Sequence, residues 1–221
     1  MLGLRLGFIK NKLMQISRLH YIVTSPAQAE LACQAGVDWV QLRVKNVAYD
    51  AWLALAREVQ LVCRRHGARL IINDNPRIAQ VIGADGVHLG KEDLPPDEVR
   101  AILGSDLIIG GTANTFADIE RLVAAGVDYI GLGPYRFTTT KQNLSPILGL
   151  EGYQDLLAQC HAAGFNVPII AIGGLTLADV APLRAAGVHG VALAGAIAGA
   201  PDPAGAAAHF LAVLNTLPSV V

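Results

Sequence analysis

The sequence has few charged residues, few aromatic residues and no long apolar run, and each shortage narrows what the protein can be. Charged residues make up 16% and aromatic residues 5% of the 221 positions, and the formal net charge is −1 at pH 7. Without a basic tract, neither nucleic acid nor an anionic membrane surface is expected as a partner. No apolar run approaches the ~20 residues that a membrane-spanning helix needs, so no membrane association is expected.

Cysteine is also scarce. The three cysteines, Cys33, Cys63 and Cys160, lie far apart in Ala-rich stretches. Their odd number and wide spacing predict buried free thiols in a reducing compartment. We therefore expect a cytoplasmic protein.

Hydrophobic residues make up 52% of the chain, enough for a sizeable core, and no linker or low-complexity stretch divides it. A single large domain is expected at this length. Residues 1–15 mix three cations with short apolar runs and lack the apolar core of a signal peptide. We expect an N-terminal extension over residues 1–15, with Met14 as an alternative start, and one domain over residues 16–221.

A repeated sequence motif indicates the architecture. The stretch Ala-Gly-Val-Asp-Trp-Val-Gln-Leu at 35–42 returns in related form at 83–89, 125–132 and 186–193. In each copy a helix is expected to end at a glycine in the left-handed conformation, after which a short apolar strand begins.

Four further apolar runs lie between these copies, each followed by a helix-like segment. They are residues 19–23, 69–72, 107–109 and 167–172. Eight short strands alternating with eight helices predict a parallel sheet closed into a single (β/α)₈ TIM barrel. A doubly wound open sheet is the alternative.

Polar residues gather where the expected strands end, which is where such barrels carry their chemistry. After the second strand, Gln41, Arg43 and Lys45 alternate with apolar residues, so they are expected to share one face. An amide and two cations on one wall suit an anion such as phosphate. A solvated edge strand is the alternative for this stretch alone.

Two carboxylates end neighbouring strands, Asp74 after the third and Asp93 after the fourth. Adjacent strands lie about 4.8 Å apart, so the two side chains can share one small cation. Mg²⁺ prefers one or two carboxylates together with substrate oxygens and water. The alternative is that either Asp caps the helix that follows it.

Glycine-rich turns end the last two strands, at Gly173-Gly174 and at Ala194-Gly195. Loops at these places, each leading into a helix, commonly hold a phosphate in barrels. A second anion site is therefore predicted there.

The connection over residues 134–148 is long and shows no element of its own, which is typical of functional loops. It carries Thr138, Thr140 and Lys141, whose hydroxyls and ammonium suit phosphate oxygens. Two anion sites with one divalent cation between them suggest the joining of two phosphorylated molecules with loss of pyrophosphate.

These residues, in this order over about 19–215, resemble the thiamine phosphate synthase family. The motifs are Gln41-Leu42-Arg43-x-Lys45, Asn73-Asp74, His88-Leu89-Gly90-x-x-Asp93, Gly131-Leu132-Gly133-Pro134, Thr138-x-Thr140-Lys141 and Ile172-Gly173-Gly174. The resemblance implies a Mg²⁺-dependent transferase on a (β/α)₈ barrel. It would couple 4-amino-5-hydroxymethyl-2-methylpyrimidine diphosphate to a thiazole phosphate, or its carboxylated tautomer, giving thiamine phosphate and pyrophosphate by a dissociative route.

The resemblance also implies roles for single residues. Asp74 and Asp93 would bind Mg²⁺. The implied catalytic residues are Arg43, Lys45, Lys141 and Thr112. The implied substrate-binding residues are Gln41, Arg43, Lys45, Asn73, Thr112, Thr138, Thr140, Lys141, Gly174, Ala194 and Gly195.

The chain departs from the family pattern at four places, one of which is Val44, where Glu is common in the family. Thr112 stands where the family usually has Ser, and Ala194-Gly195 lacks a common Ser. Asn114 stands where the family usually has His, so a proton-transferring role there is not expected. Two alternative functions stay open, a thiazole tautomerase and a non-catalytic barrel that binds phosphate ligands. The oligomeric state is also open, a homodimer being one option.

Overall fold

The computed structural model describes residues 15–137 and 146–216. Its strands are β1 (Leu19–Val23), β2 (Trp39–Leu42), β3 (Arg69–Asn73), β4 (Gly86–Leu89), β5 (Ile108–Ala113), β6 (Tyr129–Leu132), β7 (Ile169–Ile172) and β8 (Gly190–Leu193). Its helices are α2 (Pro26–Gln34), α3 (Tyr49–His66), α4 (Pro76–Ile82), α5 (Pro96–Leu103), α6 (Phe116–Ala124), α7 (Gly149–Ala162), α8 (Leu177–Ala185), α9 (Gly195–Ala198) and α10 (Pro203–Thr216).

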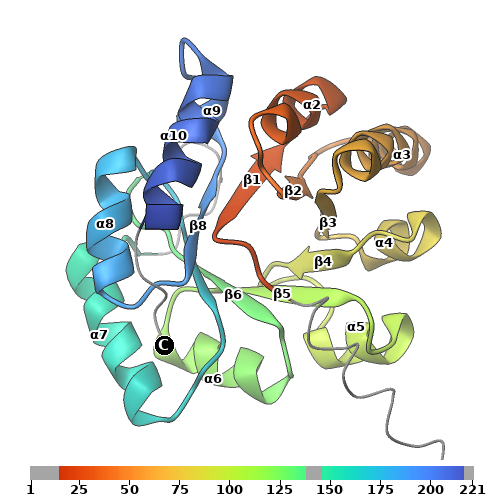
Figure 1. Ribbon diagram of the computed structural model, residues 1–221. Helices are drawn as coiled ribbons and strands as arrows, with labels where there is room; N and C mark the ends of the chain where they lie inside the picture. Colours follow the sequence, from red (N-terminus) through yellow and green to blue (C-terminus); the bar gives the residue numbers. More distant parts are fainter. Residues whose placement is uncertain (1–14, 138–145, 217–221) are drawn as a thin grey trace, which may run out of the picture.

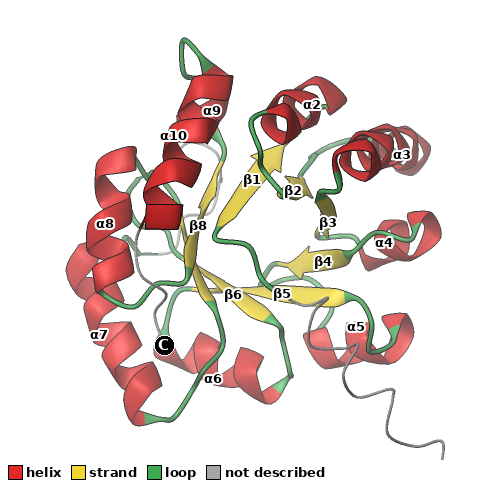
Figure 2. Cartoon of the chain, viewed as in Figure 1, coloured by secondary structure: helices red, strands yellow, loops and turns green. Residues whose placement is uncertain are grey.

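The eight strands form a closed parallel barrel in which neighbours follow chain order. Strand β8 pairs with β1, Leu193 standing beside Tyr21. Figures 1 and 2 show the helices as an outer ring around these strands. The predicted (β/α)₈ barrel is confirmed and the open sheet was wrong; the single-turn helix α9 after β8 was not expected.

The repeated glycines end helices as the sequence predicted. Gly36, Gly83, Gly126 and Gly187 have φ between 63° and 107°, which is the left-handed region that side chains resist. Each leads directly into the approach to an even-numbered strand.

The polar residue of the repeated motif forms a hydrogen bond that joins the start of each even-numbered strand to a neighbouring segment. Before β4, Asp85 Oδ2 accepts the backbone N–H of Leu70 at 2.8 Å. The related contacts join Asp128 to the N–H of Ile109 at 2.7 Å, Asp38 to the hydroxyl of Ser17 at 2.6 Å, and His189 Nε2 to the carbonyl oxygen of Ile16 at 2.8 Å.

Two apolar layers form the core, one between strands and helices and one inside the barrel. The inner cluster contains Ile16, Trp39, Ile71, Ile108, Tyr129, Ile170 and Ala192. Tyr129 fits there because its neighbour on β5 is Gly110, where a Cβ would lie 2.2 Å from the tyrosine ring. The barrel is therefore packed rather than hollow, and ligands must bind at its ends.

Cys33, Cys63 and Cys160 are free and buried, as predicted. Among the helices within residues 15–137 and 146–216, none is long and apolar enough to cross a membrane.

Candidate active site

The carboxyl ends of β2 and β3 bring four predicted residues together as two contacting pairs. Inside the barrel mouth, the buried amide of Gln41 donates to Asn73 Oδ1 at 2.7 Å. Above it, at the rim, Lys45 Nζ lies 2.6 Å from Asp74 Oδ2. Arg43 between them is half-buried, and its backbone N–H donates to the carbonyl oxygen of Val23. Gln41 and Lys45 therefore both contact residues at the end of β3, in keeping with the predicted alternation, and their binding of an anion stays a prediction.

The side chains of the two predicted metal ligands both lie close to Gly90. A Cβ on Gly90 would lie 3.1 Å from Asp93 Oδ2 and 3.8 Å from Asp74 Oδ1. The N–H of Gly90 donates to Asp93 Oδ2 at 2.6 Å. Burial, followed by the charge of the neighbouring Asp74, raises the pKa of Asp93. Two crowded carboxylates are an arrangement that a divalent cation stabilises.

Neither aspartate caps a helix. The N-cap of α4 is Asn75, whose side chain accepts the N–H of Ile78, and the N-cap of α5 is Pro95. The capping alternative for Asp74 and Asp93 was therefore wrong.

A magnesium ion at this place would have few protein ligands. Within the part of the chain that the structure describes, no group of three or more His, Cys, Asp or Glu side chains suits a metal. Asp74 and Asp93 are the carboxylates that could hold an ion here, with its other ligands coming from water or substrate oxygens.

Thr112 on β5 is positioned by a hydrogen-bonded chain that the sequence did not reveal. Its hydroxyl lies 3.0 Å from Nε2 of His88, and Nδ1 of His88 lies 3.0 Å from the hydroxyl of the buried Tyr129. Gly131 leaves room for the imidazole, since a Cβ there would lie 3.0 Å from it. The His-Leu-Gly turn was the only sequence signal for His88.

The glycine turn after β7 has the backbone that the sequence implied, with φ of 97° at Gly173 and 68° at Gly174. Arg136, to which the sequence gave no role, donates to the carbonyl oxygen of Gly174 at 3.2 Å and pairs with Asp179 at 2.6 Å. This ion pair lowers the pKa of Asp179 to about 2. The charge of Arg136 is thus balanced within α8.

At the next turn, Ala194 is the N-cap of α9 and Gly195 is its first residue. A Cβ on Gly195 would meet nothing within 4 Å, so the backbone there is accessible to a ligand. This agrees with the predicted position of a phosphate, whose binding stays a prediction.

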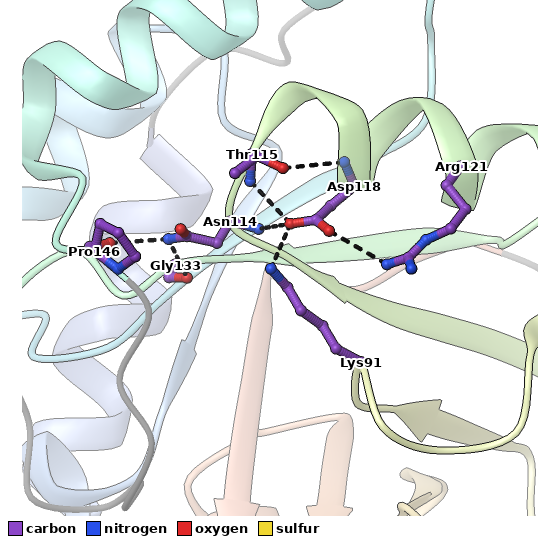
Figure 3. Close-up of polar contacts among 7 residues, drawn as sticks. All are labelled: Lys91, Asn114, Thr115, Asp118, Arg121, Gly133 and Pro146. Atoms are coloured by element: carbon purple, nitrogen blue, oxygen red, sulfur yellow. Dashed lines mark hydrogen bonds and ion pairs between the residues drawn. The ribbon is translucent and has the colours of Figure 1, made fainter.

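A polar junction surrounds Asp118 at the start of α6 (Figure 3). Lys91, from the loop after β4, lies 2.5 Å from Asp118 Oδ2, which also accepts the backbone N–H groups of Asn114 and Thr115 at 3.0 Å each. Burial alone would raise the pKa of Asp118, but Lys91 and these N–H groups outweigh it and lower the pKa to about 2. The capping-box spacing Thr115-x-x-Asp118 is the sequence signal for this junction.

Thr138, Thr140 and Lys141 lie outside the described residues, so their predicted roles are untested. The other predicted site residues all lie at or just past the carboxyl ends of strands, which share one end of a parallel barrel. A cavity of about 600 Å³ lies at the opposite end, lined among others by Gln15, Trp39 and His189, and none of the predicted residues lines it.

Known proteins resemble the chain over most of its length. The family model described as thiamine monophosphate synthase matches residues 15–197. A thiamine-phosphate synthase of Flavobacterium johnsoniae is 50% identical over 187 residues, covering 85% of this chain and 88% of that protein. One of Bacteroides fragilis is 49% identical over 175 residues, covering 79% and 86%. A thiamine phosphate pyrophosphorylase structure from Pyrococcus furiosus has a TM-score of 0.79 at 25% identity, covering 94% of this chain and 98% of that one.

Proposed function

Because the chain belongs to the thiamine monophosphate synthase family, we propose that it joins a pyrimidine diphosphate to a thiazole phosphate. The products are thiamine phosphate and inorganic pyrophosphate. The pyrimidine substrate is 4-amino-5-hydroxymethyl-2-methylpyrimidine diphosphate. The thiazole substrate is the phosphate or its carboxylated tautomer.

With the thiazole phosphate, the proposed reaction breaks one bond and forms one. With the carboxylated form, the C–C bond to the carboxyl group breaks as well, which releases CO₂ and leaves the electron pair of that bond in the thiazole ring. The methylene C–O bond of the pyrimidine diphosphate breaks, and its electron pair leaves with pyrophosphate. The lone pair of the thiazole nitrogen then forms the new C–N bond to the methylene carbon. Such a dissociative step requires stabilisation of the leaving charge and alignment of the two rings rather than a strong base.

One observation supports the proposal most directly: the side chains of Lys45, Asp74 and Asp93 lie close together at the carboxyl end of the barrel. In our scheme Lys45 and Arg43 stabilise the negative charge that develops on the leaving diphosphate. Below them, the Gln41–Asn73 pair presents amide groups to the pyrimidine diphosphate. Lys141 is proposed to add a third cation.

Asp74 and Asp93 are proposed to hold Mg²⁺. The ion would supply Lewis-acid stabilisation of the pyrophosphate oxygens. The backbone of Asp74 has φ 62°, a left-handed conformation that a residue other than Gly adopts at some cost. Strain at a predicted ligand is consistent with a functional constraint on its position.

Thr112 is proposed to contact the reacting groups through its hydroxyl, whose orientation His88 fixes. Thr138 and Thr140, with the backbone at Gly174, Ala194 and Gly195, are proposed to bind the thiazole phosphate.

The test is pyrophosphate release by the purified chain supplied with both substrates and Mg²⁺. We expect release with both substrates, none with either alone, and loss of release when EDTA removes the metal. Each thiazole form is supplied separately to identify the one used. A thiazole tautomerase would convert the carboxylated thiazole without releasing pyrophosphate, and a non-catalytic barrel would bind without turnover. Either result would overturn the proposal.

A further inference from the structure

Asn114 makes contacts that the proposed chemistry does not use. Its side chain lies just past the end of β5, where it is 3% exposed. Its Nδ2 donates to the carbonyl oxygen of Gly133 at 3.0 Å and to that of Pro146 at 2.9 Å. One buried amide therefore joins three segments, the ends of β5 and β6 and the chain just before α7 (Figure 3).

Gly133 and Pro146 lie near the two ends of the connection between β6 and α7. That connection carries Thr138, Thr140 and Lys141 in the sequence. Its return is held by the N–H of Leu148, which donates to Pro134 at 3.0 Å, and by that of Gly149, which donates to Tyr135 at 3.1 Å. Within the described residues, the hydrogen bond from Asn114 is the one side-chain bond that attaches Pro146 to the barrel.

The near end of the same connection is fastened separately. The N–H groups of Tyr135 and Arg136 donate to Ile172 and Gly173, each at 2.9 Å, and Arg136 pairs with Asp179. The near end is thus bonded to the turn after β7. The far end is bonded to the near end through Leu148 and Gly149, and to the end of β5 through Asn114.

Asn114 is itself held firmly. Its backbone N–H donates to Asp118 Oδ2, the oxygen that also binds Lys91. Since Lys91 belongs to the loop that carries Asp93, the junction links that loop, the end of β5 and the chain before α7. A displaced Asn114 would therefore disturb several parts of the rim at once.

We propose that Asn114 is a positioning residue of the transferase, which fixes the far end of the β6–α7 connection to the barrel rim by donating to Gly133 and Pro146. This inference rests on the proposed function. An amide suits the task because it supplies two N–H donors from one nitrogen and keeps both at every pH near neutrality.

The chain offers a matched control. Gln60 is also a buried amide, 8% exposed, and its Nε2 donates to two backbone carbonyl oxygens, those of Ile82 and Gly83, at 2.7 and 3.0 Å. These carbonyls end α4, at the other end of the barrel. Asn114→Leu and Gln60→Met each remove two hydrogen bonds of the same kind with little change in volume.

We expect the two variants to lose similar thermal stability and to differ in activity. Asn114→Leu should lower kcat/KM roughly 10- to 100-fold, because small displacements at a reacting site have effects of this size. Gln60→Met should keep kcat/KM within about twofold of the parent, since it lies far from the rim. Amide hydrogen exchange at Leu148 and Gly149 should accelerate only in Asn114→Leu.

The outcomes separate this inference from the proposed function. A parent chain that releases no pyrophosphate overturns the proposed function and this inference with it. An active parent whose Asn114→Leu form keeps its kcat/KM, or loses no more than Gln60→Met does, overturns the inference alone. Unchanged amide exchange at Leu148 and Gly149 in Asn114→Leu likewise contradicts it.

Discussion

Asp74 combines an unusual backbone with a side chain in an ion pair. Its N–H donates to the carbonyl oxygen of His88 at 2.8 Å, which helps to hold the left-handed φ. Its partner Lys45 is 56% exposed, so the pair contributes less than about 1 kcal/mol to stability. The ion pair alone therefore does not explain the position of Asp74, which the proposed Mg²⁺ site would explain.

Replacing Asp74 by Asn should consequently affect turnover and leave the fold intact. Asn tolerates the left-handed conformation, but it removes one charge from the proposed Mg²⁺ site. We expect kcat to fall at least about 100-fold, with Tm changed by no more than about 3 °C. Steady-state pyrophosphate release and calorimetry provide the two measurements.

The exposed Asp106, on the loop before β5, gives the matched control, and Asp106→Asn should leave both quantities unchanged. Full turnover of Asp74→Asn at saturating Mg²⁺ would show that the metal assignment is mistaken.

A residue at a strand end could be selected as a candidate site residue from the sequence when its side-chain type alone was unusual for that place. Gln41, Lys45, Asp74 and Asp93 were selected because ionisable and amide side chains are conspicuous next to apolar strands. His88 and Arg136 were not, because their importance depends on Thr112 and Asp179, partners that are 24 and 43 residues away. Such pairings exist only once the barrel closes.

At the scale of elements, the loop after β6 is attached to α8 by the Arg136–Asp179 pair. Asp179 also closes the capping box of α8 with Thr176. Its folded pKa of about 2 lies below the usual value of 3.8, so its contribution to stability is present above pH 4 and is lost as pH falls toward 2.

Asp179→Asn should therefore destabilise the protein in a pH-dependent way. Because Arg136 is half-exposed, solvent screening limits the loss to about 1 kcal/mol at pH 6. The difference in unfolding free energy from the parent should shrink between pH 4 and pH 2.5, as urea titrations would detect. Asp155→Asn, on the exposed face of α7, should show no such trend. A deficit for Asp179→Asn that stays constant with pH would contradict the assignment.

Element boundaries were less predictable than element order. The apolar run that predicted the fifth strand covers only residues 107–109. Strand β5 instead continues to Ala113. Glycines are needed there since a Cβ would lie 2.2 Å from Tyr129 at Gly110 and 2.5 Å from Leu122 at Gly111. The glycines thus provide packing space within a strand, which no local pattern reveals.

For the whole molecule, the three buried thiols report on cooperative unfolding. Cys33, Cys63 and Cys160 lie on α2, α3 and α7, and burial raises the pKa of Cys160. We expect a disulfide reagent to modify all three at least about 1,000-fold more slowly in the native protein than in urea. Mg²⁺ and pyrophosphate together should slow the reaction further. One thiol reacting within seconds while circular dichroism stays native would indicate independent opening of its helix.

The two ends of the barrel differ in how much they repeat. Where strands begin, Asp38, Asp85 and Asp128 occupy equivalent places and accept hydrogen bonds from neighbouring segments. Where strands finish, every turn carries a different set of side chains. Mutations that alter substrate preference can therefore accumulate at one end of the barrel without weakening the hydrogen bonds at the other end. Such a division favours the evolution of new specificities, because innovation and foldability then draw on separate sets of positions.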